Sequence, residues 1–511
     1  MRCCRVVSPA ILVYSYVLPR LPSPMSRLLE LSVTAVALSA LLVVTSASGC
    51  ASRTQSDPAM VAAWVRALYG VVRVERLSPP VASRLTAYAA TALYAGLASV
   101  DRDLPALTGT LNGIPELPRA VDATRYDGSI VAVVAEKLVL DSLLREGLPT
   151  THSAIAQLAD SLKTDRVSHG VIPAARARSD SLGRRVGLAI VAWSRADGFD
   201  ATRGRQYLPP AGDSLWFNDT PASNYATQNE SAVSEFVALD NPANHQRAGN
   251  VSDRGLILSR PKPAAARTLP AVNISGATEP YWHELRPFAL RSWNACPLPQ
   301  PPQYGIDSSS ALFANARTVY QTKQTLTAAQ RITALYWADN AGETGTPVGH
   351  WLSIAGQMIS ERQLSTNSAA RLVLATAVAQ ADAYIAAWGY KYQFNLLRPR
   401  SYIRRMIDSA WEPQIPTPPF PEHPAGHSSQ SSAAASVMTA LLGVTPFTDS
   451  TSVSLGHAVR AFASFQAASE EAGQSRIYGG IHYPSGNRAG LALGRCIGDT
   501  VSARLQLTRV E

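Results

Sequence analysis

Apolar residues recur at helical spacing along most of this chain, and few segments alternate between apolar and polar residues as strands do. In the first half we expect helices over 59–77, 79–100, 128–145 and 179–196. In the second half we expect helices over 308–322, 327–339, 368–388, 428–442, 455–472 and 486–504. We find no internal repeat of roughly 20–50 residues. The sequence therefore predicts an all-α fold made of helical bundles.

The composition changes between about residues 201 and 305, where Pro, Gly, Asn, Asp and Ser dominate. Large aromatic residues lie within this stretch: Trp216, Phe217, Trp282, Phe288 and Trp293. A loop of this length is either disordered or wraps over the surface, and the aromatic residues favour wrapping. We therefore predict an N-terminal helical half over 50–200, a long wrapping loop region over 201–305 and a C-terminal helical domain over 306–511.

The N-terminal region has the features of a secretory signal. An apolar stretch runs from Leu31 to Ser48, with Arg27 upstream and small residues at its end. Met25 is the better start, so residues 1–24 are expected to be an upstream extension and residues 25–49 the signal peptide. The mature protein is therefore expected to be exported.

The cysteines bear on the same question. The small residues before Cys50 resemble a bacterial lipoprotein cleavage site, which would make Cys50 the lipidated first residue. Ala47 stands where such sites usually have Leu, so an ordinary signal peptide and an uncleaved anchor remain open alternatives. We expect a periplasmic protein or one anchored to the cell envelope through lipidated Cys50. Cys296 and Cys496 can pair in an oxidising compartment, but the sequence leaves that pairing open.

The chain is basic, with a net charge of +9 and a sequence pI near 9.4. Such a balance suits a nucleic acid, a membrane surface or an anionic substrate. The chain has no run of Lys and Arg, no zinc-ligand spacing and no interleaving of aromatic and basic residues. We therefore exclude a nucleic-acid partner. After the signal, no segment has the roughly 18 uninterrupted apolar residues that a spanning helix needs.

Three short segments in the last third of the chain carry the chemistry. In the first, Lys391 ends an apolar helix and Arg398 follows seven residues later, before Pro399. If the helix continues, both cations share one face, and Pro399 then stops or bends the chain. Taken alone, this segment is better explained by a solvated helix end whose cations are favoured by the helix dipole.

The second segment is a Pro-rich approach that ends in Gly426 and His427, directly before the predicted helix 428–442. The free N–H groups of a helix start bind anions, and glycine permits close backbone approach. His427 at that start can deliver or accept a proton. A helix cap with an incidental histidine is the alternative.

In the third segment Arg476 supplies a planar guanidinium for an oxyanion. Gly479 and Gly480 permit a tight turn, which would direct His482 back towards Arg476. His482 can then act as a nucleophile or a metal ligand. An exposed polar pair is the alternative for Arg476 and His482 alone.

Together the three segments match, in order, the pattern Lys-x6-Arg-Pro, Pro-Ser-Gly-His and Ser-Arg-x5-His, except at Ala425. The chain resembles the bacterial vanadium-dependent haloperoxidases of the phosphatidic acid phosphatase (type 2) superfamily, mainly over its last third. The resemblance implies that Lys391, Arg398 and Arg476 bind the equatorial oxygens of vanadate or phosphate, helped by the backbone of Gly426.

The resemblance also implies the reaction. His427 would be the acid–base group, and His482 the axial ligand of vanadium in the cofactor vanadate. Hydrogen peroxide would oxidise halide to a species like hypohalous acid, which halogenates an organic acceptor. In that scheme His427 takes a proton from the peroxide and Lys391 polarises it.

Two residues depart from the family pattern. Ala425 replaces a serine, which removes a hydroxyl hydrogen bond of roughly 1.5–3 kcal/mol to a charged group. Gly486 stands four residues after His482, where the family often has an aspartate, and Asn487 is the candidate to orient His482 instead.

Several features favour a haloperoxidase. The long helical N-terminal half resembles the bacterial haloperoxidases, and Trp388 and Phe420 resemble the aromatic halide-side residues of chloride-oxidising members, although core packing explains them equally. Asp339 is expected to pair with an active-site arginine. The alternatives are an acid phosphatase that works through a phosphohistidine at His482, and a non-catalytic phosphate-binding lipoprotein. Related enzymes are often oligomeric, which suggests a homo-oligomer by analogy.

Overall fold

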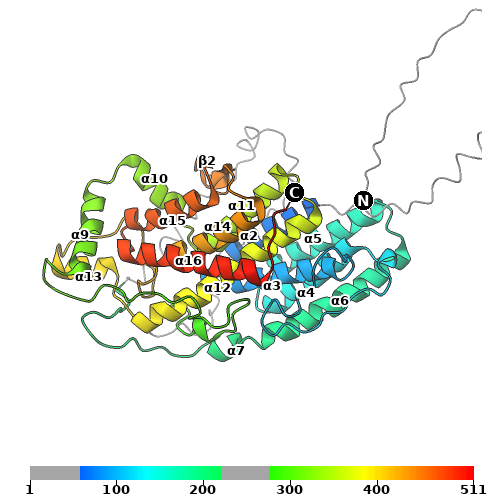
Figure 1. The fold of residues 1–511 in the computed structure, drawn as a ribbon, viewed down its shortest axis with the longest axis horizontal. Helices are drawn as coiled ribbons and strands as arrows, with labels where there is room; N and C mark the ends of the chain where they lie inside the picture. The colour runs from blue at the N-terminus through cyan, green and yellow to red at the C-terminus, as the bar shows by residue number, and fades with distance from the viewer. Residues whose placement is uncertain (1–57, 220–275, 511) are drawn as a thin grey trace, which may run out of the picture. The chain divides into compact units, whose positions relative to one another are not determined.

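The computed structural model describes residues 58–219 and 276–510, and in these residues the regular secondary structure is α-helical apart from short 3-10 turns and one two-stranded sheet (Figure 1). The helices before the long loop are α2 (Pro58–Val74), α3 (Pro79–Ala98), α4 (Gly128–Leu143), α5 (Pro149–Ser168), α6 (Pro173–Arg195) and the short α7 (Phe199–Thr202). The helices after it are α9 (Ala311–Gln324), α10 (Ala328–Tyr336), α11 (Thr346–Glu361), α12 (Thr366–Phe394), α13 (Pro399–Met406), α14 (Gly426–Leu442), α15 (Phe465–Tyr478) and α16 (Pro484–Arg504). The all-α prediction is confirmed.

Local sequence signals begin many of these helices. Ser78 caps α3 ahead of a proline in its first turn, and Thr327 forms the predicted capping box with Gln330 at the start of α10. Proline also stands in the first turn of α5, α6, α11, α13 and α16. Because proline lacks an N–H and has a helical φ, it is favoured at exactly these starts.

Helix α12 forms the centre of the core. It packs against α2 and α3 from the first half and against α11, α14 and α16 from the second half, as Figure 1 shows. It is long and apolar enough to cross a membrane, but its whole apolar window is buried within the protein. Gly490 of α16 lies so close to α14 that an added Cβ would be 2.6 Å from the Ala425 carbonyl oxygen. This close approach fixes the start of α14, which carries Gly426 and His427.

The helix that carries Lys391 does not continue to Arg398, so the condition for a shared helix face is not met. Helix α12 ends at Phe394, and Asn395 adopts the left-handed conformation with φ 48°. Arg398 is instead the N-cap residue of α13, and Pro399 begins that helix rather than ending one. The two cations therefore approach each other across a turn, and not along one helix face.

The predicted helix over 455–472 is wrong over residues 455–464 and confirmed over 465–472, which belong to α15. Residues 447–462 form a small antiparallel hairpin from β1 (Phe447–Asp449) and β2 (Arg460–Phe462), joined through the 3-10 turn Val453–Leu455. Gly456 has φ 84°, and Ser464 caps a new helix, so the helix can begin only at Phe465. The sequence prediction also missed α5, α11 and α13, and it carried the helix from 327 on to Asp339, which lies beyond the end of α10 with φ 49°.

The described flanks of the long loop pack against the chemical segments. Trp216, Trp282 and Phe288 are buried, whereas Phe217 is exposed. The Trp216 N–H donates to the Asn395 carbonyl. Residues 220–275 lie outside the described residues, so the three predicted regions remain a prediction.

Cys296, also in this loop, forms a disulfide with Cys496 of α16, a pairing that the sequence left open. The predicted upstream extension, signal peptide and Cys50 lie outside the described residues.

Candidate active site

The structure brings the three chemical segments together at one buried place. Lys391 comes from the last turn of α12, and Arg398 from the cap of α13. His427 is the second residue of α14, and Arg476 lies in the last turn of α15. Gly480 adopts φ 77° after α15, as the predicted tight turn requires, and His482 follows it. Arg398 Nη1 lies 3.1 Å from His482 Nε2, and Arg476 Nη1 lies 2.9 Å from His427 Nε2.

The cluster holds an excess of buried positive charge. Lys391, Arg398 and Arg476 are at most 1% exposed. Two carboxylates act on these cations: that of Glu422, which is fully buried and acts on Lys391 and Arg398, and that of Asp339, which acts on Arg476. Nε and Nη2 of Arg476 are buried without a hydrogen-bond partner among the described residues. Because buried cations are costly unless they are paired, this arrangement is suited to an anion.

The start of α14 adds backbone donors to the same place. The first N–H groups of a helix have no partner within it, so those at Gly426 and His427 are available to an anion. A Cβ on Gly426 would point between Lys391 and the Trp388 ring, 3.4 Å from that ring. This is an ordinary van der Waals distance, so the close approach of an anion to the Gly426 backbone remains a prediction.

His482 is held as a neutral imidazole. Its Nδ1 lies 2.8 Å from Glu422 Oε1, and its Nε2 faces Arg398. Because arginine has only donors, Nε2 must accept, so the proton lies on Nδ1 and is donated to Glu422. Burial, together with Arg398 and Lys391, holds the pKa of His482 well below its usual range. A neutral ring with an Nε2 lone pair directed into the site can serve as a metal ligand or a nucleophile.

The expected role of Asn487 is wrong. Its Oδ1 accepts a hydrogen bond from Ser428 Oγ at 2.7 Å, and Glu422 orients His482 in its place. The sequence analysis missed Glu422. The available signal was an acidic side chain within an apolar, Pro-rich run that directly precedes a cluster of cations.

Lys391 was expected to bind an oxyanion, but in this structure its ammonium group is hydrogen-bonded to backbone carbonyls. Its Nζ donates to the carbonyls of Pro421, Glu422 and Pro424 at 3.0, 2.9 and 2.6 Å. These three bonds use all three donors of the ammonium group. In this structure Lys391 therefore fixes the loop before α14, while burial and the nearby Arg398 hold its pKa well below the usual range.

His427 differs from these groups because it is only half-buried. It accepts a hydrogen bond from Arg476, so its Nε2 also carries a lone pair. Burial and the charge of Arg476 hold its pKa well below the usual range. The arrangement presents a neutral, accessible proton acceptor beside the anion site.

Comparison with known proteins agrees with this geometry. The sequence has no significant match among curated proteins. Residues 371–509 match the family VCPO second helical-bundle domain. The structure is similar to a crystal structure of the first bacterial vanadium-dependent iodoperoxidase, with a TM-score of 0.73 and 28% identity, covering 88% of this chain and 97% of that one. The chain is a structural relative of the bacterial vanadium-dependent haloperoxidases.

Two further haloperoxidase structures share the fold. The holo and apo forms of a bacterial vanadium-dependent chloroperoxidase match with TM-scores of 0.58 and 0.57 at 16% and 15% identity. These matches cover 85% and 86% of this chain and 93% and 96% of the chloroperoxidase chains. The helical N-terminal half of this chain is therefore part of the shared haloperoxidase fold and not an unrelated addition.

The two aromatic residues that resemble halide-side groups of haloperoxidases lie beside the cations. The rings of Trp388 and Phe420 are 4.9 Å apart. Lys391 Nζ lies 5.1 Å and Arg398 Cζ 4.8 Å from the Phe420 ring centroid. These distances are typical of cation–π contacts. Their proposed contact with halide remains a prediction.

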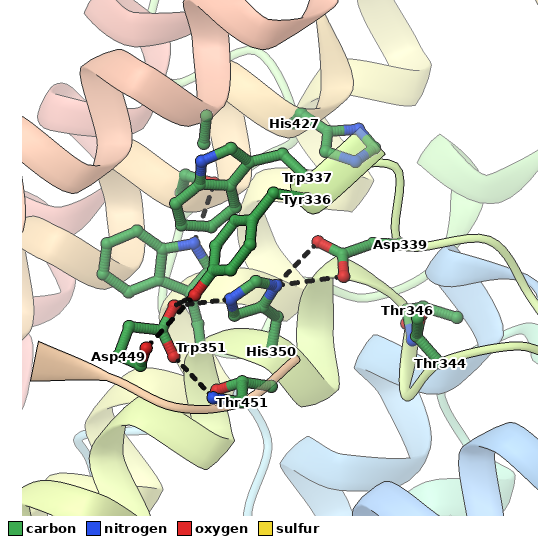
Figure 2. Close-up of polar contacts among 12 residues, drawn as sticks. Tyr336, Trp337, Asp339, Thr344, Thr346, His350, Trp351, His427, Asp449 and Thr451 are labelled. Carbon is green, nitrogen blue, oxygen red and sulfur yellow. Dashed lines mark hydrogen bonds and ion pairs between the residues drawn. The ribbon is translucent and has the colours of Figure 1, made fainter. Parts of the chain in front are cut away.

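Asp339 interacts electrostatically with Arg476: burial lowers the pKa of Arg476, and the charge of Asp339 opposes that shift. Among the described residues, Asp339 makes its side-chain hydrogen bonds to His350 and none to an arginine. Its carboxylate lies 3.0 Å from His350 Nδ1, and His350 Nε2 lies 2.7 Å from Asp449 (Figure 2). The hydroxyl of Tyr336 also donates to Asp449, and the Trp337 ring stacks on His350 at 4.5 Å. Asp449 belongs to none of the motifs recognised in the sequence, so this buried cluster was not predicted.

The cluster supports the active site through the backbone. Arg476 Nη1 donates to the carbonyl of Trp337, which lies between Tyr336 and the left-handed residue Asp339. His350 therefore fixes the backbone around Trp337 and Asp339, and this backbone in turn positions Arg476. Figure 2 shows His427 next to this turn.

We expect the Asp339–His350–Asp449 cluster to make stability depend on pH. Burial opposes the charge on His350, but Asp339 and Asp449 outweigh it and raise its pKa from 6.5 to about 10. Burial also opposes the charge on Asp449, but His350 holds the pKa of Asp449 well below its usual 3.8. The stabilisation from this cluster is therefore complete between about pH 4 and 6.5. It declines at higher pH and is lost as pH rises through about 10, where His350 loses its proton. It is also lost at strongly acidic pH, where Asp449 gains a proton.

Replacing His350 with alanine tests this expectation. The change leaves two buried carboxylates without their cation and should destabilise the fold by about 3–5 kcal/mol near pH 6. The measurement is Tm against pH for wild type and variant. The difference should shrink above pH 10, and His457→Ala, beside the same Tyr336 ring, is the matched control. A difference in Tm that stays constant with pH would contradict the charged cluster.

Proposed function

We propose that the protein is a vanadate-dependent haloperoxidase that uses hydrogen peroxide to oxidise halide to a halogenating species like hypohalous acid. The observation that carries the proposal is a buried cluster of cations into which a neutral histidine directs its Nε2 lone pair. A purely cationic pocket would suit any oxyanion. The oriented His482 adds a nitrogen ligand. Vanadate accepts a bond from nitrogen to its central atom more readily than phosphate does, so this ligand favours vanadate.

The residues present fit vanadate. Arg398, Arg476 and the N–H groups at Gly426 would hold its oxygens, and His482 Nε2 would hold the vanadium. The unpartnered Nε and Nη2 of Arg476 supply two donors that the protein itself leaves unused. When bound, vanadate acts as a Lewis acid that activates peroxide towards halide without changing its own oxidation state.

The remaining chemistry falls to the protein. His427 is neutral and half-buried, so it can take the proton of incoming hydrogen peroxide and return it to the departing product. Arg476 contacts both His427 and the anion site, which keeps the proton acceptor next to the reacting oxygen. The buried surroundings strengthen these charge interactions because water does not screen them.

The test is halogenation of a phenolic dye by the purified protein with hydrogen peroxide and bromide or iodide. We expect activity that requires added vanadate and is suppressed by phosphate, which competes for the same cations. Hydrolysis of a phosphomonoester, inhibited by vanadate and without halogenation, would favour the acid phosphatase. Binding of phosphate or vanadate with neither activity would favour the non-catalytic lipoprotein.

Ala425 offers a gain-of-binding test. It is buried as the cap residue of α14 and provides no side-chain hydrogen bond there. Ala425→Ser should restore a hydroxyl donor and lower the Kd for vanadate by about tenfold, the equivalent of about 1.4 kcal/mol. Calorimetry measures the Kd, and Ala425→Gly is the control without a hydroxyl. An unchanged Kd with a higher Tm would mean that the serine caps α14 instead.

We also propose that the protein is exported and held at the cell envelope by lipidated Cys50. We propose in addition that it halogenates an organic acceptor and that it forms a homo-oligomer, as related enzymes do. The apolar 31–48 stretch and the small residues before Cys50 support export. Cys50→Ser should move the protein from the membrane fraction to the soluble periplasmic fraction, as immunoblotting of fractionated cells would show. An unchanged distribution would contradict lipidation.

A further inference from the structure

We propose that Glu422 is the positioning residue of His482, and that Gly486 is glycine because the Glu422 carboxylate occupies the space of any side chain there. The inference rests on the proposed function, since it assigns how the vanadium-binding histidine is held. Glu422 lies in the loop before α14, whereas the sequence analysis looked for the partner of His482 in α16, the helix that follows His482.

The contacts of Glu422 are directed at His482 and its neighbour. Its Oε1 lies 2.8 Å from His482 Nδ1 and accepts the Tyr483 N–H at 3.0 Å. One carboxylate oxygen thus holds both the side chain of His482 and the backbone that follows it. All three residues are at most 2% exposed, so no water competes for these bonds.

The space around Glu422 explains Gly486. A Cβ built on Gly486 would lie 2.8 Å from both Cδ and Oε2 of Glu422, and closer still to Oε1. Real Cβ atoms do not approach a carboxylate so closely, and both groups are buried. A side chain at position 486 is therefore incompatible with the Glu422 carboxylate in its position against His482. An acid can reach His482 from one place or the other, but not from both.

The loop that carries Glu422 is fixed independently of His482. The Glu422 N–H donates to the Leu396 carbonyl at 3.0 Å, and its own carbonyl accepts from Lys391 Nζ at 2.9 Å. Ala425 N–H donates to the Gly486 carbonyl at 3.0 Å, which joins the loop to the start of α16. Lys391 therefore acts on His482 through this loop. Glu422 is held well enough to accept the Nδ1 proton and to set the direction of the His482 ring.

The experiment compares Glu422→Ala, Glu422→Gln and the exchange variant Glu422→Ala with Gly486→Asp. Titrations with vanadate alone and with inorganic phosphate alone give two Kd values for each protein. Vanadate uses the bond to His482 Nε2, whereas phosphate uses only the cations and backbone donors. Loss of a partner that orients a metal-binding histidine typically lowers metal affinity about 10–100-fold.

We expect Glu422→Ala to raise the vanadate Kd by about 10–100-fold and the phosphate Kd much less. Glu422→Gln keeps an acceptor oxygen and should retain most of the vanadate affinity. Gly486→Asp should recover vanadate affinity in the Glu422→Ala background but lower Tm in the wild-type background. A parallel loss of vanadate and phosphate affinity in Glu422→Ala would overturn the proposal, because it would indicate a collapsed loop.

A second readout does not depend on vanadate. In protein labelled with ¹⁵N-histidine, the wild-type His482 signals should show a neutral ring protonated on Nδ1, assigned by their loss in His482→Ala. Arg398 still donates to Nε2 in Glu422→Ala, so the tautomer should stay the same, but the Nδ1–H signal should shift because that proton loses its acceptor. The exchange variant should restore the signal. An unaltered Nδ1–H signal in Glu422→Ala would overturn the proposal even if the wild type binds no vanadate. Conversely, a wild type that binds vanadate but does not halogenate would contradict the proposed function and leave this inference intact.

Discussion

Replacing His482 with alanine should abolish vanadate-dependent halogenation, lowering kcat/KM by roughly a thousandfold or more. Among the groups that meet at the site, His482 presents a neutral nitrogen lone pair that is both fully buried and fixed by a carboxylate. Alanine removes that lone pair and leaves Arg398, Arg476 and Lys391 in place. The variant should therefore still bind phosphate nearly as well as wild type, while its vanadate affinity falls to a similar level.

The measurement pairs dye halogenation with titrations of both anions. His169→Ala is the matched control, because His169 is an exposed residue at the end of α5 and far in sequence from the site. Activity that survives in His482→Ala would sink both the haloperoxidase and the phosphatase hypotheses, since both need this imidazole. Loss of phosphate binding as well would show that the change disturbs the cation cluster.

The residues that meet at the site were largely predictable because each motif carries its own chemistry locally. Gly426 and His427 begin a helix, and the pair of glycines after Arg476 permits the turn to His482, whatever the rest of the chain does. The Thr327 capping box is local in the same sense, and it was confirmed. The resemblance to haloperoxidases followed from the order of such motifs, and the structural comparisons confirm it.

The failures arise where distant residues decide the outcome. Glu422 reaches His482 across 60 positions of sequence, and His350 reaches Asp449 across 99, so no spacing rule connects them. Asn395 ends α12 in a left-handed conformation that helical periodicity does not reveal. For Glu422 and His350 a tertiary contact, and not a local preference, fixes the partner.

Glycine at 486 illustrates how such a contact can mislead. The missing acid suggested a weakened site, and the neighbouring Asn487 was the nearest substitute in sequence. The structure instead places a carboxylate from another loop in the same space. An absent residue in a motif therefore indicates a lost function only if no other segment supplies the same group.

Replacing His427 with alanine should separate proton transfer from cofactor binding. We expect kcat to fall by about 10²–10⁴-fold, the usual contribution of a general acid–base group, with the vanadate Kd changed by less than about tenfold. His427 contacts Arg476 but holds no ligand position for vanadium, so Arg398, His482 and the start of α14 should retain the anion. Steady-state kinetics in peroxide and a vanadate titration measure the two effects.

The partly buried position of His427 permits a control by chemical rescue. Free imidazole should enter the space left by His427→Ala and restore part of kcat, whereas it should not restore fully buried His482→Ala. A His427→Ala variant that keeps wild-type kcat would show that solvent takes the peroxide proton. The double variant should be no slower than His482→Ala alone, because a proton acceptor contributes only when the vanadium ligand is present; additive losses would mean that the two histidines act independently.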